Sequence, residues 1–472
     1  MEKDNLNFNN LRKKYPEFAY RNYSYRIKEG NLKVSFFFEI EPNICFQPEI
    51  VVKNVDQSRI EKIGERVLDN LIFHLGLIEM VSYWKATCSP IIKIQAGCLD
   101  KKQIAWWKDL IIKGMGQFFY ENKIDFRPAD FLKIIVEKEG SGRPAKNLPL
   151  SKNKVLTLIG GGKDSIVTLE ILKKTNKEIA CLGLNPTKAA AKIMKTGCGK
   201  NPIIISRKID KNLLKLNQKG FLNGHTPFSA YLAFLSSLAA VLFNAKYAAV
   251  SNEKSSNEGN LSYLGKTVNH QWSKSFEFEE KFRKYSKKYL LPDFEYFSFL
   301  RPLYEIQIAG LFSMKPQYFG IFLSCNEAQK TASGREKPAG KWCGRCSKCL
   351  FVFAVLYPFL EEKHLLKIFK KNLFKDKNLL PVMKQLIGER GFKPFECVGT
   401  KKESLTAFYL SWRKHDNRPP LPFLLDYFQK KVRPKHSDLA KEGRKILNHW
   451  NKRHNLPGIF EKILRQETLE RR

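Results

Sequence analysis

The sequence predicts an α/β protein whose central part is a parallel, doubly wound sheet. Short apolar runs alternate with helical stretches in the middle of the chain, which is typical of that class. One of these runs leads through a glycine-rich turn into a helix. Hydrophobic residues make up 43% of the 472 residues and aromatic residues 12%, so large cores can form. A chain of this length corresponds to about two to four domains.

We divide the chain into three consecutive parts. Residues 1–148 are predicted to form an N-terminal α+β domain, residues 149–360 the central α/β domain, and residues 361–472 a basic helical C-terminal region. Glycine, serine and proline gather between Glu139 and Pro149, which favours a boundary there.

The N-terminal part mixes strand and helix patterns. β-branched and aromatic residues dominate Leu32–Ile40 and Phe131–Glu137, which predicts strands. Apolar residues recur at helical spacing in Ile60–Trp84 and Gln103–Tyr120, which predicts helices.

The central part alternates between the two patterns, and the C-terminal part is helical. Helices are predicted over Asp164–Lys174 and Pro227–Phe243, and several amphipathic helices without a strand are predicted over residues 361–472. Short apolar runs are predicted to be strands at Lys154–Ile159, Glu178–Leu184, Pro202–Ser206, Tyr247–Ser251 and Gly320–Ser324.

The net charge of +37 is the compositional outlier. It fits a nucleic acid, a membrane surface or an anionic small substrate as the partner. Because lysine is spread along the whole chain, we favour a general lysine-rich background. Nucleic acid is therefore not predicted as a partner, although charge alone leaves it open.

Nothing in the sequence predicts a membrane span or a secreted scaffold. The N-terminus is polar, and the longest apolar stretches are interrupted by proline or polar residues. Ten cysteines are too sparse for a disulfide scaffold, so we expect a reducing, cytoplasmic location. Cysteines without a spacing partner are expected to be small core residues; they are Cys98, Cys181, Cys198 and Cys397.

Three glycines follow the first central strand and lead into a helix. Glycine lets the backbone turn tightly and brings amides close to phosphate oxygens, and the helix start adds positive potential. The Lys163 ammonium and the Ser165 hydroxyl can contact phosphate, and Asp164 can bind Mg²⁺. The predicted phosphate loop consists of Gly160, Gly161, Gly162, Lys163, Asp164 and Ser165.

The loop is neither a Walker loop, which needs four residues between its first glycine and Gly-Lys-Ser/Thr, nor a Rossmann fingerprint. It resembles the PP-loop of the adenine-nucleotide alpha-hydrolase-like ATP pyrophosphatases, usually Ser-Gly-Gly-x-Asp-Ser. Gly160 stands where the first serine is usual, so one hydroxyl contact to pyrophosphate is missing. The resemblance implies ATP and Mg²⁺ as cofactors and cleavage between the α and β phosphates.

Three further polar segments are candidates for substrate contacts. Asn223–Ala230 opens a helix and Val268–Glu279 precedes one, although a capped helix explains the first equally well. Ser251–Asn260 follows a strand, at the edge where doubly wound sheets bind ligands, with a surface loop as the alternative. The predicted catalytic residues are Lys163, Asp164, Glu253, Lys254 and Glu258.

Together these segments resemble the UDP-N-acetyl-α-D-muramoyl-L-alanyl-L-glutamate epimerases, the MurL family. The resemblance extends over most of the chain. The matching segments are Gly76–Ala86, Gly160–Ser165, Gly224–Phe228, Ser251–Asn260, Trp342–Phe351 and Pro394–Thr400.

The family implies inversion of the terminal L-Glu of UDP-MurNAc-L-Ala-L-Glu in peptidoglycan precursor synthesis, with AMP and pyrophosphate released. A free carboxylate makes the neighbouring Cα–H a very poor acid, and adenylation of that carboxylate removes its charge. A base then takes the proton, the proton returns on the opposite face, and water cleaves the acyl-adenylate. A substrate with a diphosphate and carboxylates also gives the basic side chains a role.

The cysteines cluster in one short segment. Cys343, Cys346 and Cys349 have two residues between neighbours, which is the spacing of metal ligands on one knuckle. Cys325 is the best candidate for a fourth ligand, and a similar arrangement occurs in the queuosine-pathway nitrile synthase, another PP-loop enzyme. We predict a structural Zn²⁺, with unligated cysteines or a catalytic thiol pair as alternatives.

Two other function classes stay open. A PP-loop tRNA-modifying enzyme, such as a thiolase, would use the positive charge on RNA and would gather it beside the loop. A non-catalytic nucleotide-binding or nucleic-acid-binding module follows if Gly160 disables the loop.

Overall fold

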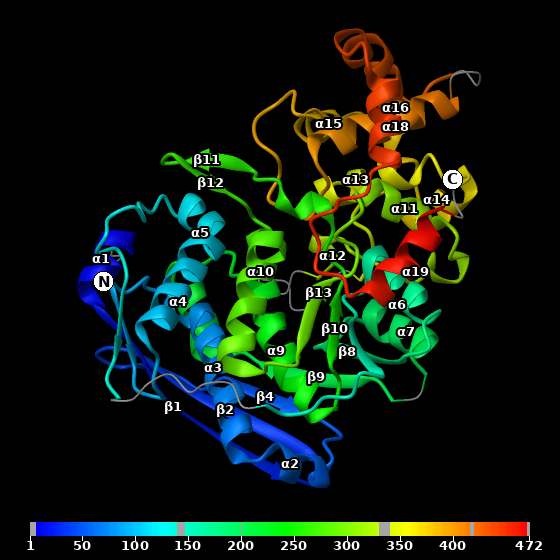
Figure 1. Cartoon of the computed structure of the whole chain (residues 1–472). Coiled ribbons are helices and arrows are strands. Elements are labelled where there is room, and N and C mark those ends of the chain that lie inside the picture. Colours follow the sequence, from blue (N-terminus) through cyan, green and yellow to red (C-terminus); the bar gives the residue numbers. More distant parts are fainter. Residues whose placement is uncertain (1–5, 139–146, 200, 330–339, 416–419, 470–472) are drawn as a thin grey trace. The chain divides into compact units, whose positions relative to one another are not determined.

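The computed structural model describes residues 6–138, 147–199, 201–329, 340–415 and 420–469 (Figure 1). Most of the predicted boundary between Glu139 and Pro149 therefore lies outside the described residues.

The chain forms two compact units that are interleaved in sequence. Unit 1 consists of residues 1–156, 203–248 and 262–296, and unit 2 of residues 157–202, 249–261 and 297–472. This division differs from the three consecutive parts predicted above, because the chain returns to each unit more than once.

Unit 1 contains a mixed sheet. Its strands are β1 (Glu17–Lys28), β2 (Asn31–Ile40), β3 (Ile44–Phe46), β4 (Glu49–Val52), β5 (Ile91–Ile94), β6 (Lys133–Val136) and β9 (Ile203–Lys208). Their order is β9-β4-β2-β1-β5-β6, with β3 paired to β2. The pairs β1–β5 and β5–β6 are parallel, and the others are antiparallel. The strands predicted at 32–40 and 131–137 are confirmed.

The helical stretches predicted at 60–84 and 103–120 are confirmed, although each forms two helices. The helices of unit 1 are α1 (Phe8–Lys14), α2 (Gln57–Ile63), α3 (Glu65–Trp84), α4 (Lys101–Gly114), α5 (Gly116–Glu121), α8 (Lys211–Gln218), α9 (Phe228–Leu242) and α10 (Phe276–Tyr285). Gly64, with φ of +73°, separates α2 from α3 because its backbone lies in the left-handed region. A separate two-stranded sheet pairs β11 (Leu261–Tyr263) with β12 (Lys266–Val268).

A buried ion pair ties α3 to β9. Glu79 is fully buried in α3, and the Arg207 guanidinium donates to both of its carboxylate oxygens, at 2.8 Å from Nε to Oε2 and 2.8 Å from Nη2 to Oε1. Arg207 also stacks over the Tyr231 ring at 4.6 Å. Such a pair is costly to break, because removing one partner leaves the other charge buried and unpaired.

We therefore expect Glu79→Gln to lower the free energy of unfolding by about 3–5 kcal/mol. The matched control is Glu461→Gln in α19 (Gly458–Leu469), because Glu461 is 30% exposed and pairs with Arg465 one helical turn away. That change should cost less than about 1 kcal/mol. Equal losses for the two variants in denaturant unfolding would contradict the structural role of Glu79.

Four further strands pair in the order β13-β10-β7-β8. They are β7 (Lys154–Leu158), β8 (Glu178–Leu184), β10 (Tyr247–Val250) and β13 (Glu295–Ser298). The helix α6 (Lys163–Leu172) connects β7 to its neighbour β8, a crossover of the kind that parallel neighbours require. The helix α7 (Lys188–Gly197) follows β8. The chain is thus a mixed α/β protein.

The remainder of unit 2 is helical, as predicted for residues 361–472. Its helices are α11 (Glu305–Ser313), α12 (Asn326–Gln329), α13 (Ser347–Leu356), α14 (Glu362–Phe369), α15 (Leu380–Ile387), α16 (Lys401–His415), α17 (Phe423–Tyr427), α18 (Leu439–Leu447) and α19. From Lys348 to Leu356, α13 is buried along its whole length. Within the described ranges, every helix is too short or too polar to cross a membrane.

Two predictions for this region are wrong. Gly320–Ser324 forms turns and not a strand: the amides of Ile321 and Phe322 both donate to the Tyr318 carbonyl. Cys181 and Cys198 form a disulfide with a Cα–Cα distance of 5.9 Å, although they were expected to be lone core residues. Cys181 lies in β8 and Cys198 caps α7, so folding of the strand–helix pair brings together cysteines with no recognisable spacing.

Candidate functional site

The predicted phosphate loop joins the end of β7 to the start of α6. Gly161 has a φ of +94°, and a Cβ on it would lie 3.1 Å from the Ala190 amide nitrogen. Both facts require glycine at this position. Gly162 is the residue before α6, and the helix has no side-chain cap among the described residues. The first amides of α6 are thus free of an intrahelical partner, which suits an anion.

Lys163 begins α6 but is turned into the protein. Its side chain is 1% exposed, and its ammonium contacts the carboxylates of Asp164 and Glu305. Burial lowers the pKa of Lys163, but these two carboxylates outweigh burial and hold the pKa above its usual value. Lys163 therefore carries its positive charge directly behind the loop.

Glu305, at the start of α11, is the centre of this buried cluster. Its carboxylate contacts Lys163 on one side and lies 3.7 Å from the Lys348 ammonium on the other. The side chains of Glu305 and Lys348 are 2% and 6% exposed. Sequence analysis missed Glu305, which no motif marks; Lys348 could have been noticed because it lies inside the cysteine motif.

The other two polar loop residues differ from Lys163. Asp164 is accessible to a ligand, and Ser165 makes a hydrogen bond within the loop. The Asp164 side chain is 24% exposed, so a metal ion can reach its carboxylate beside Lys163. The Ser165 hydroxyl donates to the Gly162 carbonyl at 2.9 Å, which leaves the oxygen lone pairs and not the proton free for another partner.

The loop Ser251–Asn260 follows β10, as predicted, and contains the short 3₁₀ helix η1 (Lys254–Asn257). The fully buried Arg301 shapes it: Nη1 donates to the Glu253 carbonyl at 2.7 Å and to the Ser256 hydroxyl at 2.8 Å. Glu253 itself is 4% exposed. Sequence analysis missed Arg301, since basic residues are common throughout this chain.

Lys254 and Glu258 face different partners. Lys254 Nζ lies 2.6 Å from His449 Nε2 and 4.5 Å from the centre of the Tyr304 ring. Burial lowers the pKa of Lys254 from its usual value. Glu258 lies at the other end of η1, with a carboxylate oxygen 3.6 Å from Lys393 Nζ. A lysine with a lowered pKa can exchange a proton more readily than an exposed one.

A second buried carboxylate lies under this loop. Ser255 donates to Glu403 Oε2 at 2.6 Å, and Glu403 is fully buried. Its pKa is raised, chiefly by burial and further by the negative charge of Glu305. The hydrogen bond of Ser255 thus joins the loop 251–260 to α16, which carries Glu403.

The four predicted metal-ligand cysteines lie together. The Sγ atoms of Cys325, Cys343, Cys346 and Cys349 are all within 4.8 Å of one another, and those of Cys343 and Cys349 are 3.6 Å apart. Hydrogen bonding with Cys325 raises the pKa of Cys346, with burial adding to it. Four neighbouring thiols cannot all ionise without a cation, so this donor set suits a soft metal ion such as zinc.

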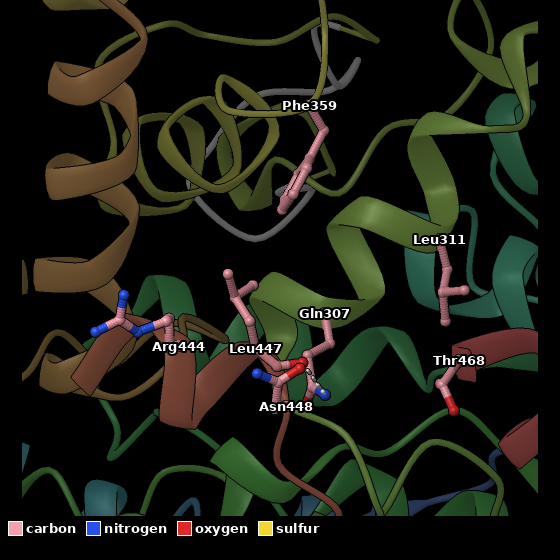
Figure 2. Close-up of a pocket in the computed structure, with 7 residues that line it drawn as sticks. All are labelled: Gln307, Leu311, Phe359, Arg444, Leu447, Asn448 and Thr468. Atoms are coloured by element: carbon pink, nitrogen blue, oxygen red, sulfur yellow. Dashed lines mark hydrogen bonds between the residues drawn. The ribbon is translucent and has the colours of Figure 1, made fainter. Parts of the chain in front are cut away.

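A separate cavity in unit 2 has a volume of about 270 Å³. Figure 2 shows Gln307 pointing toward Leu447 and Asn448, and Gln307 Nε2 donates to the Leu447 carbonyl at 3.0 Å. None of the predicted site residues lines this cavity, and its volume is below that of most small-molecule sites. We do not assign substrate to it.

The other two polar segments belong to unit 1 and meet there. The rings of His225 and His270 are 4.5 Å apart, and Gln117 contacts His270 at 2.5 Å. Burial lowers the pKa of His225, and the neighbouring His270 lowers it further. The segments Asn223–Ala230 and Val268–Glu279 are therefore neighbours, which their separation in sequence did not reveal.

Comparison with known proteins identifies the family. The MurL N-terminal domain model matches residues 9–299, and the MurL C-terminal domain model matches residues 321–440. The chain belongs to the MurL family. Proteins named UDP-N-acetyl-alpha-D-muramoyl-L-alanyl-L-glutamate epimerase from Micromonospora sp. and Xanthomonas oryzae pv. oryzae are each 34% identical over 337 residues, 71% of this chain and 73% and 72% of theirs. One from Salinispora tropica is 32% identical over 78% of both chains.

The residues of the candidate site are distributed over both MurL domain matches. The phosphate loop and the loop 251–260 lie within the MurL N-terminal match, and the four cysteines, Lys348 and Glu403 lie within the MurL C-terminal match. Glu305 lies in the interval between the two. In this MurL chain a residue outside both matches therefore connects the groups that each of them supplies.

Proposed function

We propose that this protein is an ATP-dependent epimerase that inverts the terminal L-Glu of UDP-MurNAc-L-Ala-L-Glu to D-Glu, in the synthesis of peptidoglycan precursors. The observation that carries the proposal is the 32–34% identity to three proteins named for this epimerase, over 71–78% of the chain. These relatives support the epimerase over the tRNA-modifying alternative.

The residues of the phosphate loop fit the binding of ATP phosphates. The crowded Gly161 and the uncapped start of α6 provide backbone donors, and Lys163 places a cation behind them. Asp164, partly exposed beside them, would hold Mg²⁺, which neutralises charge on the departing pyrophosphate. The α-carboxylate of the terminal L-Glu attacks the α-phosphorus of ATP, and pyrophosphate leaves.

We assign proton transfer at Cα to the loop 251–260. Once the carboxylate is adenylated, its charge is neutralised and the Cα proton becomes acidic enough for a side-chain base. Lys254 is the best placed base, because burial lowers its pKa and His449 lies 2.6 Å away to share a proton. After the proton has returned on the opposite face, water adds to the acyl carbon and AMP leaves.

This assignment predicts that Lys254→Met separates the two half-reactions. AMP formation should persist, because the phosphate loop is intact, whereas exchange of the Cα proton with deuterated water should fall by about 100-fold or more. The matched control is Lys402→Met, whose side chain is 76% exposed. Loss of both half-reactions in Lys254→Met, or of neither, would show that Lys254 is not the base.

The products of ATP test the proposed chemistry. We expect ³¹P NMR to show AMP and pyrophosphate, formed only when the UDP-MurNAc dipeptide is present. ADP and phosphate would contradict adenylation. Substrate-independent AMP formation together with RNA bound to the purified protein, seen as a high 260/280 absorbance ratio, would favour the tRNA-modifying enzyme instead.

A further inference from the structure

The geometry of the four cysteines fits a single metal ion. Four sulfurs placed tetrahedrally at the zinc–sulfur distance of about 2.3 Å lie about 3.8 Å from one another. The Sγ atoms of Cys343 and Cys349 are 3.6 Å apart, and all four sulfurs lie within 4.8 Å. An iron–sulfur cluster needs room between the thiolates for its own atoms, so the spacing favours one tetrahedral ion.

One side of the cluster reaches the phosphate loop through Ser324, the residue before Cys325. The Leu323 amide donates to the Gly161 carbonyl at 2.8 Å, and a Cβ on Gly162 would lie 3.3 Å from the Ser324 Cβ. The Ser324 hydroxyl oxygen is buried and has no hydrogen-bond partner among the described residues. A buried hydroxyl without a partner is costly unless a ligand satisfies it.

The other side of the cluster reaches the phosphate loop through Lys348, which lies between Cys346 and Cys349. Its amide donates to the Glu396 carboxylate at 2.5 Å, and its ammonium contacts the Cys397 carbonyl. The ammonium lies 3.7 Å from Glu305, which holds Lys163 of the loop. The cysteines are therefore linked to the phosphate loop directly through Leu323 and Ser324 and indirectly through Lys348 and Glu305.

The segment before Cys325 is held at Phe322 and Leu323 but not at the Ser324 side chain. Phe322 is buried against the rings of Phe312 and Trp342. The Leu323 amide donates to the Gly161 carbonyl, whereas the Ser324 hydroxyl has no hydrogen-bond partner among the described residues. Coordination of Cys325 would fix the neighbouring residue, since a metal–thiolate bond restrains both the position and the orientation of its ligand.

We propose that the four cysteines bind one zinc-class ion, and that this ion positions Ser324 and Lys348 at the phosphate loop. Ser324 then donates to a phosphate oxygen, while Lys348 keeps Glu305 and Lys163 in place. This inference rests on the proposed function, because the phosphate belongs to ATP. Ser324 contacts the nucleotide, and Lys348 is a positioning residue.

Metal content and ATP affinity test the inference without any epimerase assay. Wild-type protein should contain about one zinc per chain by elemental analysis, and ATP binding with Mg²⁺ is measured by calorimetry. Ser324→Ala should keep its zinc and its melting temperature but bind ATP about tenfold more weakly, the effect of one hydrogen bond to a charged group. Ser324→Thr, which keeps the hydroxyl, should restore most of the affinity.

Cys346→Ser should lose the zinc and weaken ATP binding at least as much as Ser324→Ala. The matched controls are Cys45→Ser, an exposed cysteine, and Ser313→Ala, whose hydroxyl donates to the Gly310 carbonyl at 2.7 Å. Both controls should retain zinc and ATP affinity.

The contrary outcomes are distinct. Metal-free wild-type protein, or Ser324→Ala with wild-type affinity for ATP, would overturn the inference and leave the proposed function standing. Wild-type protein that contains zinc but binds no ATP would overturn the proposed function and the phosphate role of Ser324 together.

Discussion

Glu305→Gln is expected to lower the free energy of unfolding by about 3–5 kcal/mol and to abolish ATP-dependent turnover. The carboxylate of Glu305 lies between Lys163 and Lys348, and all three side chains are no more than 6% exposed. An amide of the same size leaves the ammonium groups without their shared counter-charge in a region that water does not reach. Both consequences can be measured, by denaturant unfolding and by AMP release.

The matched control is again Glu461→Gln, because its ion pair with Arg465 is exposed. A loss below about 1 kcal/mol in Glu305→Gln, equal to that of the control, would contradict the buried cluster. It would mean that Lys163 turns toward solvent and does not depend on Glu305.

Asp164→Asn is expected to reduce AMP formation by about 100-fold or more while changing stability far less than Glu305→Gln. Asparagine preserves the shape of the turn but removes the charge proposed to hold Mg²⁺. Lys163 keeps Glu305 as a counter-charge in this variant, so the buried cluster survives. Single-turnover AMP release and the melting temperature measure the two effects.

Glu362→Gln is a suitable control for Asp164→Asn. Both carboxylates lie in the first turn of a helix, α6 and α14, where they interact favourably with the helix dipole. The control should therefore show any loss of stability that comes from removing a charge near the helix dipole, and it should leave AMP formation unchanged. Unchanged AMP release in Asp164→Asn would show that Asp164 does not bind the metal.

Local patterns were sufficient to place the glycine-rich loop between a strand and a helix and to single out the cysteines that lie together. The strand, glycines and helix start around Gly160 follow one another along the chain, so their geometry depends on neighbouring residues alone. The cysteine knuckle is equally local. Cys325 was singled out because it ends the apolar run Gly320–Ser324 upstream of the knuckle, and the structure brings its sulfur to the other three.

Long-range contacts account for what the sequence did not reveal. Glu305, Arg301 and Glu403 have no motif around them, and their roles arise only when separate segments of unit 2 pack together. Gly320–Ser324 is apolar enough for a strand, but Leu323 gives its amide to the phosphate loop instead of to a ladder. The disulfide of Cys181 and Cys198 likewise depends on how α7 packs after β8.

The most direct test of the account is incubation with UDP-MurNAc-L-Ala-L-Glu, ATP and Mg²⁺, followed by hydrolysis of the product and chiral analysis of its glutamate. We predict that D-Glu accumulates only when ATP is present, together with AMP and pyrophosphate. Glutamate that remains entirely in the L form, with no ATP-dependent release of AMP, would contradict the proposed function.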